Sequence, residues 1–233
     1  GHWSLVTFYT HWSFLVRTRA DKINTAQWLE VMETAHGVGL RTTSTIMYGH
    51  VEGPQHWAHH LLRLRQLQAR TGGFTEFVPL PFVHMEAPIY LKGRARKGPT
   101  YREAILMHAV ARLALNPHIQ NIQTSWVKMG PDGSRACLQV GANDMGGTLM
   151  NETITRSAGA AWGQELAPQQ MEDLITSIAR TPRQRTTLYG PVPGERDAVS
   201  RVAKELDLIV NTSPQAIKNK PIKSIKNSES GAI

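Results

Sequence analysis

Residues 40–83 decide the fold, and they read LRTTSTIMYG HVEGPQHWAHHLLRLRQLQARTGG FTEFVPLPFV. The stretch 40–49 is rich in β-branched and aromatic residues, which is typical of a strand. Residues 53–73 have apolar positions at helical spacing, Pro54 near the first turn and two glycines at the end, so they predict a helix. Residues 74–83 predict a second strand. A strand, a helix and a strand in succession indicate a βαβ unit with parallel strands.

The same alternation continues on both sides of this unit. We predict helices at 23–39, 101–115, 132–141, 148–160 and 168–180, strands at 119–130 and 142–148, the latter very short or a turn, and an extended piece at 183–190. The loop 84–100 is long enough to suggest a functional role. No G-x-G-x-x-G segment follows a strand, which argues against a Rossmann domain. We therefore predict an α/β fold, half of a (β/α) barrel, with its functional rim where strands end and loops begin.

The composition narrows the class of protein. The chain has 233 residues, 41% of them hydrophobic, which suffices for a buried core. Its formal net charge is +8, but four lysines of the polar tail, Lys218, Lys220, Lys223 and Lys226, carry much of that excess. Basic residues elsewhere alternate with acids, and no aromatic–basic platform is visible, so we expect no nucleic-acid partner.

Cysteine content and apolar runs indicate the compartment. The single cysteine, Cys137, excludes an internal disulfide and fits a reducing, cytoplasmic setting. One cysteine is also too few to hold an iron–sulfur cluster within this chain. No run of about 18 apolar residues occurs, so we expect no membrane span. Residues 1–16 have no basic start and make a poor signal peptide.

Five blocks of sequence together resemble one family closely. They are RTTSTIMYGHVE, RTGGFTEFVPLPFV, IQTSWVKMG, GANDMGGTLMNE and RQRTTLY, and they occur in family order. The chain is similar over about Asp21 to Tyr189 to the tyrosine-using half of FO synthase. The resemblance implies the C-terminal part of a radical S-adenosylmethionine (SAM) barrel, about strands five to eight. We expect this part at 21–190, a helix and a basic tail at 191–233, and an unplaced segment at 1–20.

The family's activity follows as an implication of this resemblance. Such enzymes use SAM and a 4Fe–4S cluster to transfer the 4-hydroxybenzyl group of tyrosine to 5-amino-6-(D-ribitylamino)uracil, a step in deazaflavin and coenzyme F420 synthesis. The family's C-x-x-x-C-x-x-C loop is absent from this sequence, and Cys137 cannot replace it. We therefore expect an inactive C-terminal fragment, whose partners would be the N-terminal half or the companion half of FO synthase.

The resemblance also implies residues that bind the cofactor. TIMYGHVE fits the fifth-strand motif of radical SAM enzymes. Thr45 takes the place of its first glycine, Met47 would pack on adenine, Gly49 would let the backbone approach, and Glu52 would anchor the turn. Backbone groups from Val78 to Leu80, helped by Phe82, should reach the adenine edge. Without a cofactor role, Met47 would simply be a buried residue of the strand and Glu52 would be exposed to solvent.

Substrate-binding and catalytic candidates lie at the other strand ends. Amide and carboxylate side chains suit a uracil and a ribityl chain, and an indole ring can stack on a flat ring. We predict substrate contacts from His50, Gln123, Trp126, Asn143, Arg183 and Arg185, with His84 and Asp144 as catalytic candidates. Each candidate also has a purely structural interpretation. Trp126 could belong to the core, Asn143 and Asp144 could cap a helix, His84 could be an ordinary loop residue, and the two arginines could fix the last strand.

Three histidines at helical spacing suggest metal binding at first sight. His56, His59 and His60 have the i, i+3, i+4 pattern, but the H-E-x-x-H pattern of zinc hydrolases is absent, and we expect no metal site here. Three other readings stay open: a zinc hydrolase on a barrel, a non-catalytic remnant, and a menaquinone-pathway relative of the aminofutalosine synthase or futalosine cyclase type.

Overall fold

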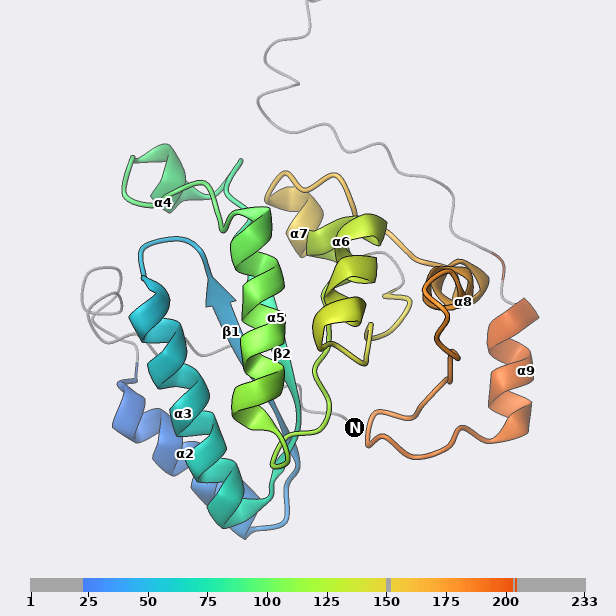
Figure 1. Ribbon diagram of the computed structural model, residues 1–233, viewed down its shortest axis with the longest axis horizontal. Helices are drawn as coiled ribbons and strands as arrows, with labels where there is room; N and C mark the ends of the chain where they lie inside the picture. The colour runs from blue at the N-terminus through green and yellow to red at the C-terminus, as the bar shows by residue number, and fades with distance from the viewer. Residues whose placement is uncertain (1–22, 150–151, 203, 205–233) are drawn as a thin grey trace, which may run out of the picture.

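A parallel pair of strands covered by helices forms the centre of the protein (Figure 1). The computed structural model describes residues 23–149, 152–202 and 204. The elements run in the order α2 (Thr25–Gly37), β1 (Thr42–Tyr48), α3 (Pro54–Thr71), β2 (Phe74–Pro81), α4 (Pro88–Leu91), α5 (Tyr101–Leu115), α6 (Trp126–Val140), α7 (Ile154–Ser157), α8 (Pro168–Thr176) and α9 (Gly194–Val202). The α/β class and the parallel pairing are confirmed.

Local signals set the ends of the helices that flank the sheet. Asn24 caps α2, because its Oδ1 accepts the Gln27 amide at 3.0 Å while the Gln27 side chain accepts the Asn24 amide at 2.9 Å. Gly72 ends α3 with φ +61°, a left-handed conformation that favours glycine. Thr100 accepts the Glu103 amide at 3.2 Å and so starts α5 where the sequence predicts it.

The sheet extends beyond β1 and β2 by single bridges. Phe77 of β2 bridges in parallel to Ile122, and Gln123 bridges in parallel to Asp144. Four chain segments therefore lie side by side in sequence order, but the third and fourth are bridges and not full strands.

Two sequence predictions about these later segments are wrong. The expected strand at 119–130 is replaced from Trp126 by helix α6, whose first turn forms when Lys128 and Met129 donate to the Ser125 carbonyl at 3.0 and 2.9 Å. A kink at Gly130 (φ +67°) and Pro131 separates this turn from the predicted helix. The helix expected at 148–160 is only Ile154–Ser157 among its described residues. Gly159, with φ +98°, lies two residues beyond it, and the chain turns there.

Helices cover one face of the sheet, and the core lies there. β1 alternates strictly, so that Ser44, Ile46 and Tyr48 are buried under the helices. Leucines of α3 and α5 pack on this side with Phe77, which is fully buried. Each such side chain contributes about 1.5–3 kcal/mol by burial. Thr43, Thr45 and Met47 occupy the opposite, half-buried face, which we call the open face.

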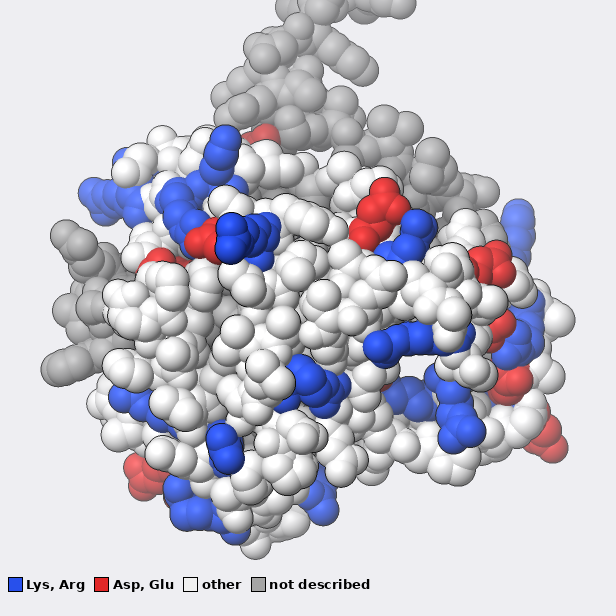
Figure 2. Space-filling view, viewed as in Figure 1, with Lys and Arg blue, Asp and Glu red and all other residues white. Residues whose placement is uncertain are grey.

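Positive and negative side chains are mixed on the surface of the protein. Figure 2 shows Lys and Arg side chains scattered among Asp and Glu on one face of the molecule, with no single continuous basic patch there. None of the helices within the described residues has the length and apolar character needed to cross a bilayer.

Candidate functional site

The turn after β1 is held by one buried carboxylate. Glu52 accepts hydrogen bonds from the backbone amides of Gly49, His50 and Val51, from the His50 ring and from Trp57 Nε1. The last of these measures 2.8 Å. Glu52 is only 8% exposed, so these donors replace its water shell. It is neither a solvated glutamate nor available to a ligand, because its oxygens are already used within the turn.

The ionisation of Glu52 follows from these donors. Burial opposes its charge, but the hydrogen bond and positive charge of His50, with the Gly49 amide and the Trp57 indole, hold the pKa of Glu52 far below its ordinary value. Gly49 itself adopts φ +92°, and a Cβ there would lie 2.2 Å from Cδ of Pro99. The turn therefore needs a glycine at 49 and an ionised carboxylate at 52.

The predicted cofactor residues of the two strands lie opposite one another. In the parallel register Thr45 faces Val78 and Met47 faces Leu80. Thr45, Met47 and Leu80 are half-buried, and Val78 is 6% exposed. They make an apolar wall on the open face near the carboxyl ends of β1 and β2. The amide of Phe82 donates to the Tyr48 carbonyl at 2.9 Å and is thus already used.

His50 and His84 flank the same strand ends differently. His50 is 4% exposed, bonds to Glu52 and lies 5.4 Å, ring to ring, from Phe82. His84 is half-buried in the loop after β2, with its ring edge-on to Tyr90 at 4.6 Å. Burial, and then the charge of Lys97, lower the pKa of His84, which therefore favours the neutral imidazole.

Gln123 and Trp126 follow the third segment but face different surroundings. The Gln123 side chain is half-buried and lies against Gly146, where a Cβ would meet its Nε2 at 2.5 Å. Trp126 is 4% exposed, belongs to the core, and donates from Nε1 to the Gly147 carbonyl at 3.0 Å. Gln123 thus borders the open face, whereas the Trp126 ring is largely covered by protein.

Asn143 lies apart from this face. Its Oδ1 accepts the Ile122 amide at 2.8 Å and Arg112 Nη2 at 2.8 Å. This oxygen therefore ties the third segment to the fourth and to helix α5. Asp144, the next residue, bridges in parallel to Gln123, and its side chain turns to Arg185, on the other side from Asn143 as expected for neighbours that alternate across a sheet.

Asp144 and Arg185 bind each other. Arg185 donates from Nε and Nη2 to the two oxygens of Asp144, the second at 2.9 Å, and its Nη2 lies 3.7 Å from Glu76. Tyr189 donates to Glu76 at 2.7 Å, and the Arg185 guanidinium lies 3.9 Å from the Tyr189 ring centre. Thr43 also donates to Glu76, at 3.0 Å. The segment after α8 is thus fixed across the open face by a partly buried ionic cluster.

The surroundings of Arg185 and Tyr189 stabilise the cation of the first and the neutral phenol of the second. Burial disfavours the Arg185 cation, but Asp144, Tyr189 and Glu76 together raise its pKa. Burial, followed by the charge of Asp144, the hydrogen bond to Glu76 and the charge of Glu76, raises the pKa of Tyr189, so its hydroxyl stays protonated and donates. The described contacts thus give Asp144 and Arg185 each other as partners. Asp144 also accepts the Gly146 amide at 2.6 Å, a turn in place of the predicted helix cap.

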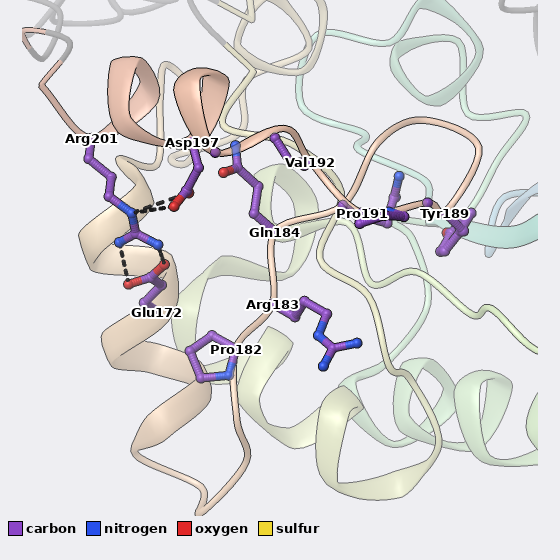
Figure 3. Close-up of a pocket in the computed structure, with 12 residues that line it drawn as sticks. Glu172, Pro182, Arg183, Gln184, Tyr189, Pro191, Val192, Asp197 and Arg201 are labelled. Carbon is purple, nitrogen blue, oxygen red and sulfur yellow. Dashed lines mark hydrogen bonds and ion pairs between the residues drawn. The ribbon is translucent and has the colours of Figure 1, made fainter.

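Arg183 lines a hollow beside α8 and α9 (Figure 3). The hollow has a volume of about 560 Å³. Arg201 spans it by pairing with Glu172 at 2.8 Å and with Asp197 at 3.2 Å. Arg183 is exposed and points away from that pair. Arg185 lines the same hollow, but its guanidinium turns to the carboxylate of Asp144.

The three histidines of α3 point in different directions. His56 Nδ1 accepts the Gly53 amide at 3.0 Å, His60 is buried near Phe77, and His59 is exposed. Within residues 23–149 and 152–202, no three His, Cys, Asp or Glu side chains gather in a way that could hold a metal ion. Cys137 is buried next to His108, and burial raises the pKa of its thiol to about 11.

Several residues of the site are missing from the sequence predictions. Glu76 and Tyr189 belong to the ionic cluster, and a glutamate in the middle of an otherwise apolar strand was the available signal for Glu76. Lys128, in the first turn of α6, is half-buried and donates to Thr155 Oγ1 at 3.4 Å. The sequence prediction places Lys128 at a strand end on the functional rim but assigns it no role.

The family described as CofH/MqnC C-terminal region matches residues 71–197, more than half of the chain. The chain belongs to the CofH/MqnC family. The match takes in β2, the ionic cluster and the first turn of α9, and it confirms the family group that the five sequence blocks indicate.

Curated relatives of this CofH/MqnC chain carry related names. It is 54% identical over 180 residues to the FO synthase of Streptomyces coelicolor, covering 77% of the chain and 21% of that protein. It is 55% identical over 168 residues to the FO synthase of Mycobacterium leprae, covering 72% and 20%. It is 51% identical over 172 residues to the 5-amino-6-(D-ribitylamino)uracil–L-tyrosine 4-hydroxyphenyl transferase of Methanopyrus kandleri, covering 74% and 47%. The chain thus spans about a fifth to a half of these relatives.

Proposed function

We propose that this chain supplies one wall of an FO synthase active site, in which the 4-hydroxybenzyl part of tyrosine is joined to 5-amino-6-(D-ribitylamino)uracil. Residues 21–190 would be about strands five to eight of a radical SAM (β/α) barrel, with 191–233 as a C-terminal extension. The observation that carries the proposal is the turn Gly49–Glu52, clamped by its own carboxylate at the end of a parallel strand. Identities of 51–55% to enzymes with these names support it.

The described residues fit the adenine end of SAM in part. Met47 and Leu80 face each other at half-buried positions beside the Gly49 turn, and a flat apolar ring suits such a wall. The amides of Gly49 and Phe82 are used by Glu52 and Tyr48, so polar recognition would rest on other groups of β2. SAM, when bound, supplies the capacity to abstract a hydrogen atom from the substrate. The wall's task is to exclude water from that site.

The residues do not fit a 4Fe–4S cluster. Such a cluster needs about three or four thiolates, and this sequence has one cysteine, which is buried and holds its proton up to about pH 11. We therefore route no step through a cluster held by this chain. Its cysteines would belong to an N-terminal half or a companion half, which is the partner that the proposal requires.

Substrate residues can be assigned by exclusion within the proposal. Gln123 keeps an amide on the open face, and His84 keeps an imidazole with a lowered pKa at its rim, so both remain candidates to bind the uracil or move a proton. Asp144 and Arg185 would act as positioning residues, because they hold the 183–191 segment against the sheet. The buried Trp126 and the exposed Asn143 would support the same strand ends through their hydrogen bonds.

A chimera tests the proposed function directly. Residues 23–202 of this chain would replace the matching stretch of the Streptomyces coelicolor FO synthase, and FO formation from tyrosine and the ribitylaminouracil would be followed anaerobically by mass spectrometry. We expect product from the chimera, and none when Gly49 is replaced by Val. A chimera that folds and holds its cluster yet forms no FO would refute the proposal. Activity on a futalosine-type substrate instead would favour the menaquinone-pathway alternative.

A further inference from the structure

Two opposite charges lie close together without forming an ion pair at the start of α6. Lys128 donates one hydrogen bond, to Thr155 Oγ1 at 3.4 Å. Glu152 accepts the Thr155 amide on Oε1 at 2.9 Å. Thr155, only 4% exposed, therefore lies between the ammonium and the carboxylate. Within the described part of the chain, no carboxylate lies within 4.0 Å of the Lys128 ammonium.

Both charged groups keep bonding capacity that these contacts do not use. An ammonium has three N–H donors, and the described contacts of Lys128 use one of them in a long bond. Glu152 Oε2 is buried and has no partner among the described residues. A buried carboxylate oxygen without a donor is costly, so a site of this kind favours a ligand that brings one. Burial lowers the pKa of Lys128, and the nearby charge of Glu152 partly opposes this effect.

The place is suitable for a substrate. Lys128 follows the third segment of the sheet by a few residues, on the carboxyl-terminal side where barrel enzymes keep their ligands. Helix α7, which carries Thr155, lies beside the start of α6 (Figure 1). Gly163 backs the carboxylate, since a Cβ there would lie 3.4 Å from Glu152 Oε2 and 3.0 Å from Val127. A small backbone wall thus borders the unpaired oxygen.

We propose that Lys128, Glu152 and Thr155 form a subsite for the α-amino-acid group of a ligand, with Lys128 binding its carboxylate and Glu152 Oε2 its ammonium. Hydrogen bonds of about 3 Å on each side of Thr155 place the two protein charges roughly 5 to 8 Å apart. A zwitterionic amino acid, whose own charges are about 3 Å apart, bridges such a gap with two bonds of ordinary length. A simple anion would leave the Glu152 oxygen unpaired, and a simple amine would leave Lys128 unpaired.

This inference rests on the proposed function for the identity of the ligand. Tyrosine carries an α-amino-acid group, and so does the methionyl end of SAM, so the shared chemistry has two possible sources. The two are distinguished by titrating the 233-residue chain with L-tyrosine and, separately, with S-adenosylhomocysteine. The subsite takes whichever ligand loses affinity on substitution of Lys128 and Glu152.

The test uses isothermal titration calorimetry with ligands that lack one group each. Tyramine has no carboxylate, and 3-(4-hydroxyphenyl)propionate has no ammonium. We expect the Lys128→Met variant to bind L-tyrosine about 10- to 100-fold more weakly and tyramine unchanged, because only the carboxylate loses its partner. Glu152→Gln should weaken L-tyrosine by a similar factor and leave the propionate unchanged. Lys128→Arg should retain most of the affinity, and Lys92→Met, at an exposed lysine, should change nothing.

Clear outcomes would overturn the inference. One such outcome is that the wild-type chain binds neither amino-acid ligand more tightly than its analogues. Another is that Lys128→Met weakens the binding of every ligand by the same factor. In the chimera, FO formation with an unchanged KM for tyrosine after Lys128→Met would also overturn a tyrosine subsite while leaving the proposed function intact. Conversely, amino-acid binding that depends on both residues in a chimera that forms no FO would refute only the proposed function.

Discussion

Replacing Glu52 by Gln should destabilise the protein far more than its single-atom change suggests. One carboxylate oxygen accepts from Gly49 and Trp57, and the other accepts from two amides and the His50 ring. A glutamine would place its NH2 group where one of these two oxygens lies. At least two of the present donors would then point at an N–H group instead of an acceptor. Hydrogen bonds to a buried charge are worth about 1.5–3 kcal/mol each. We therefore expect the free energy of unfolding to fall by about 3–5 kcal/mol.

The pH dependence gives this prediction a second, independent readout. The pKa of Glu52 is lowered in the folded protein, so its contribution is fully present above the unfolded pKa of about 4.3 and is lost as the pH falls toward the folded value. The difference in unfolding free energy between wild type and Glu52→Gln should thus be constant at neutral pH and shrink below about pH 4. Urea denaturation followed by circular dichroism at several pH values measures both quantities.

A matched control separates this effect from the chemistry of a Glu→Gln change. Glu33 forms an exposed ion pair with Arg70 at 3.2 Å, with half of its side chain in solvent. Glu33→Gln should cost less than about 1 kcal/mol. A Glu52→Gln loss as small as that of Glu33→Gln, or one that does not change on acidification, would refute the clamp that we derive from the contacts of Glu52.

Three further perturbations test other parts of the structure. Arg185→Met leaves the buried Asp144 side chain without its bidentate partner and should lower the free energy of unfolding by about 2–4 kcal/mol. Adding Asp144→Asn to this variant should restore part of the loss, and additive losses of the two substitutions in urea denaturation would contradict the pairing. Gly49→Ala should lower the free energy of unfolding by more than about 2 kcal/mol, because the new Cβ would lie 2.2 Å from Pro99. Gly39 also has a positive φ but nothing within 4 Å of a Cβ, so Gly39→Ala should lower it by only about 1 kcal/mol in the same assay. Equal losses for the two variants would argue against the contact with Pro99. Cys137, buried and with a thiol pKa raised to about 11, should react with a thiol reagent at pH 8 only as fast as the protein unfolds, and rapid labelling of the native chain would show that it is accessible.

Local sequence signals were sufficient for the first half of the fold. β1, α3, β2 and α5 all begin within two residues of their predicted starts, because capping residues, glycines and strict apolar periodicity agree there. The prediction fails at residues 126–130 and over most of 148–160, whereas the helix expected at 168–180 begins at Pro168 as predicted. Trp126 and Val127 favour a strand by propensity, but the Ser125 carbonyl accepts amides of the following residues and winds them into a helix.

The candidate site shows the same division between local and distant information. Gly49 and Glu52 could be singled out because their roles depend on a turn only a few residues long. The pairing of Asp144 with Arg185 joins residues 41 positions apart, and no local pattern indicates it. The sequence marked both residues as important for the site, but only the fold shows that each is the other's partner.

The tie between Tyr189 and Glu76 has a consequence for how the protein is made. These two residues are 113 positions apart in the chain. At a synthesis rate of about 5–20 residues per second, Glu76 is added to the chain roughly 6–23 s before Tyr189. During that interval Glu76 has no phenol to bind and the open face lacks the 183–191 segment. A nascent chain at this stage would therefore expose a half-apolar sheet surface, and it is the species in which we expect chaperone binding to be strongest.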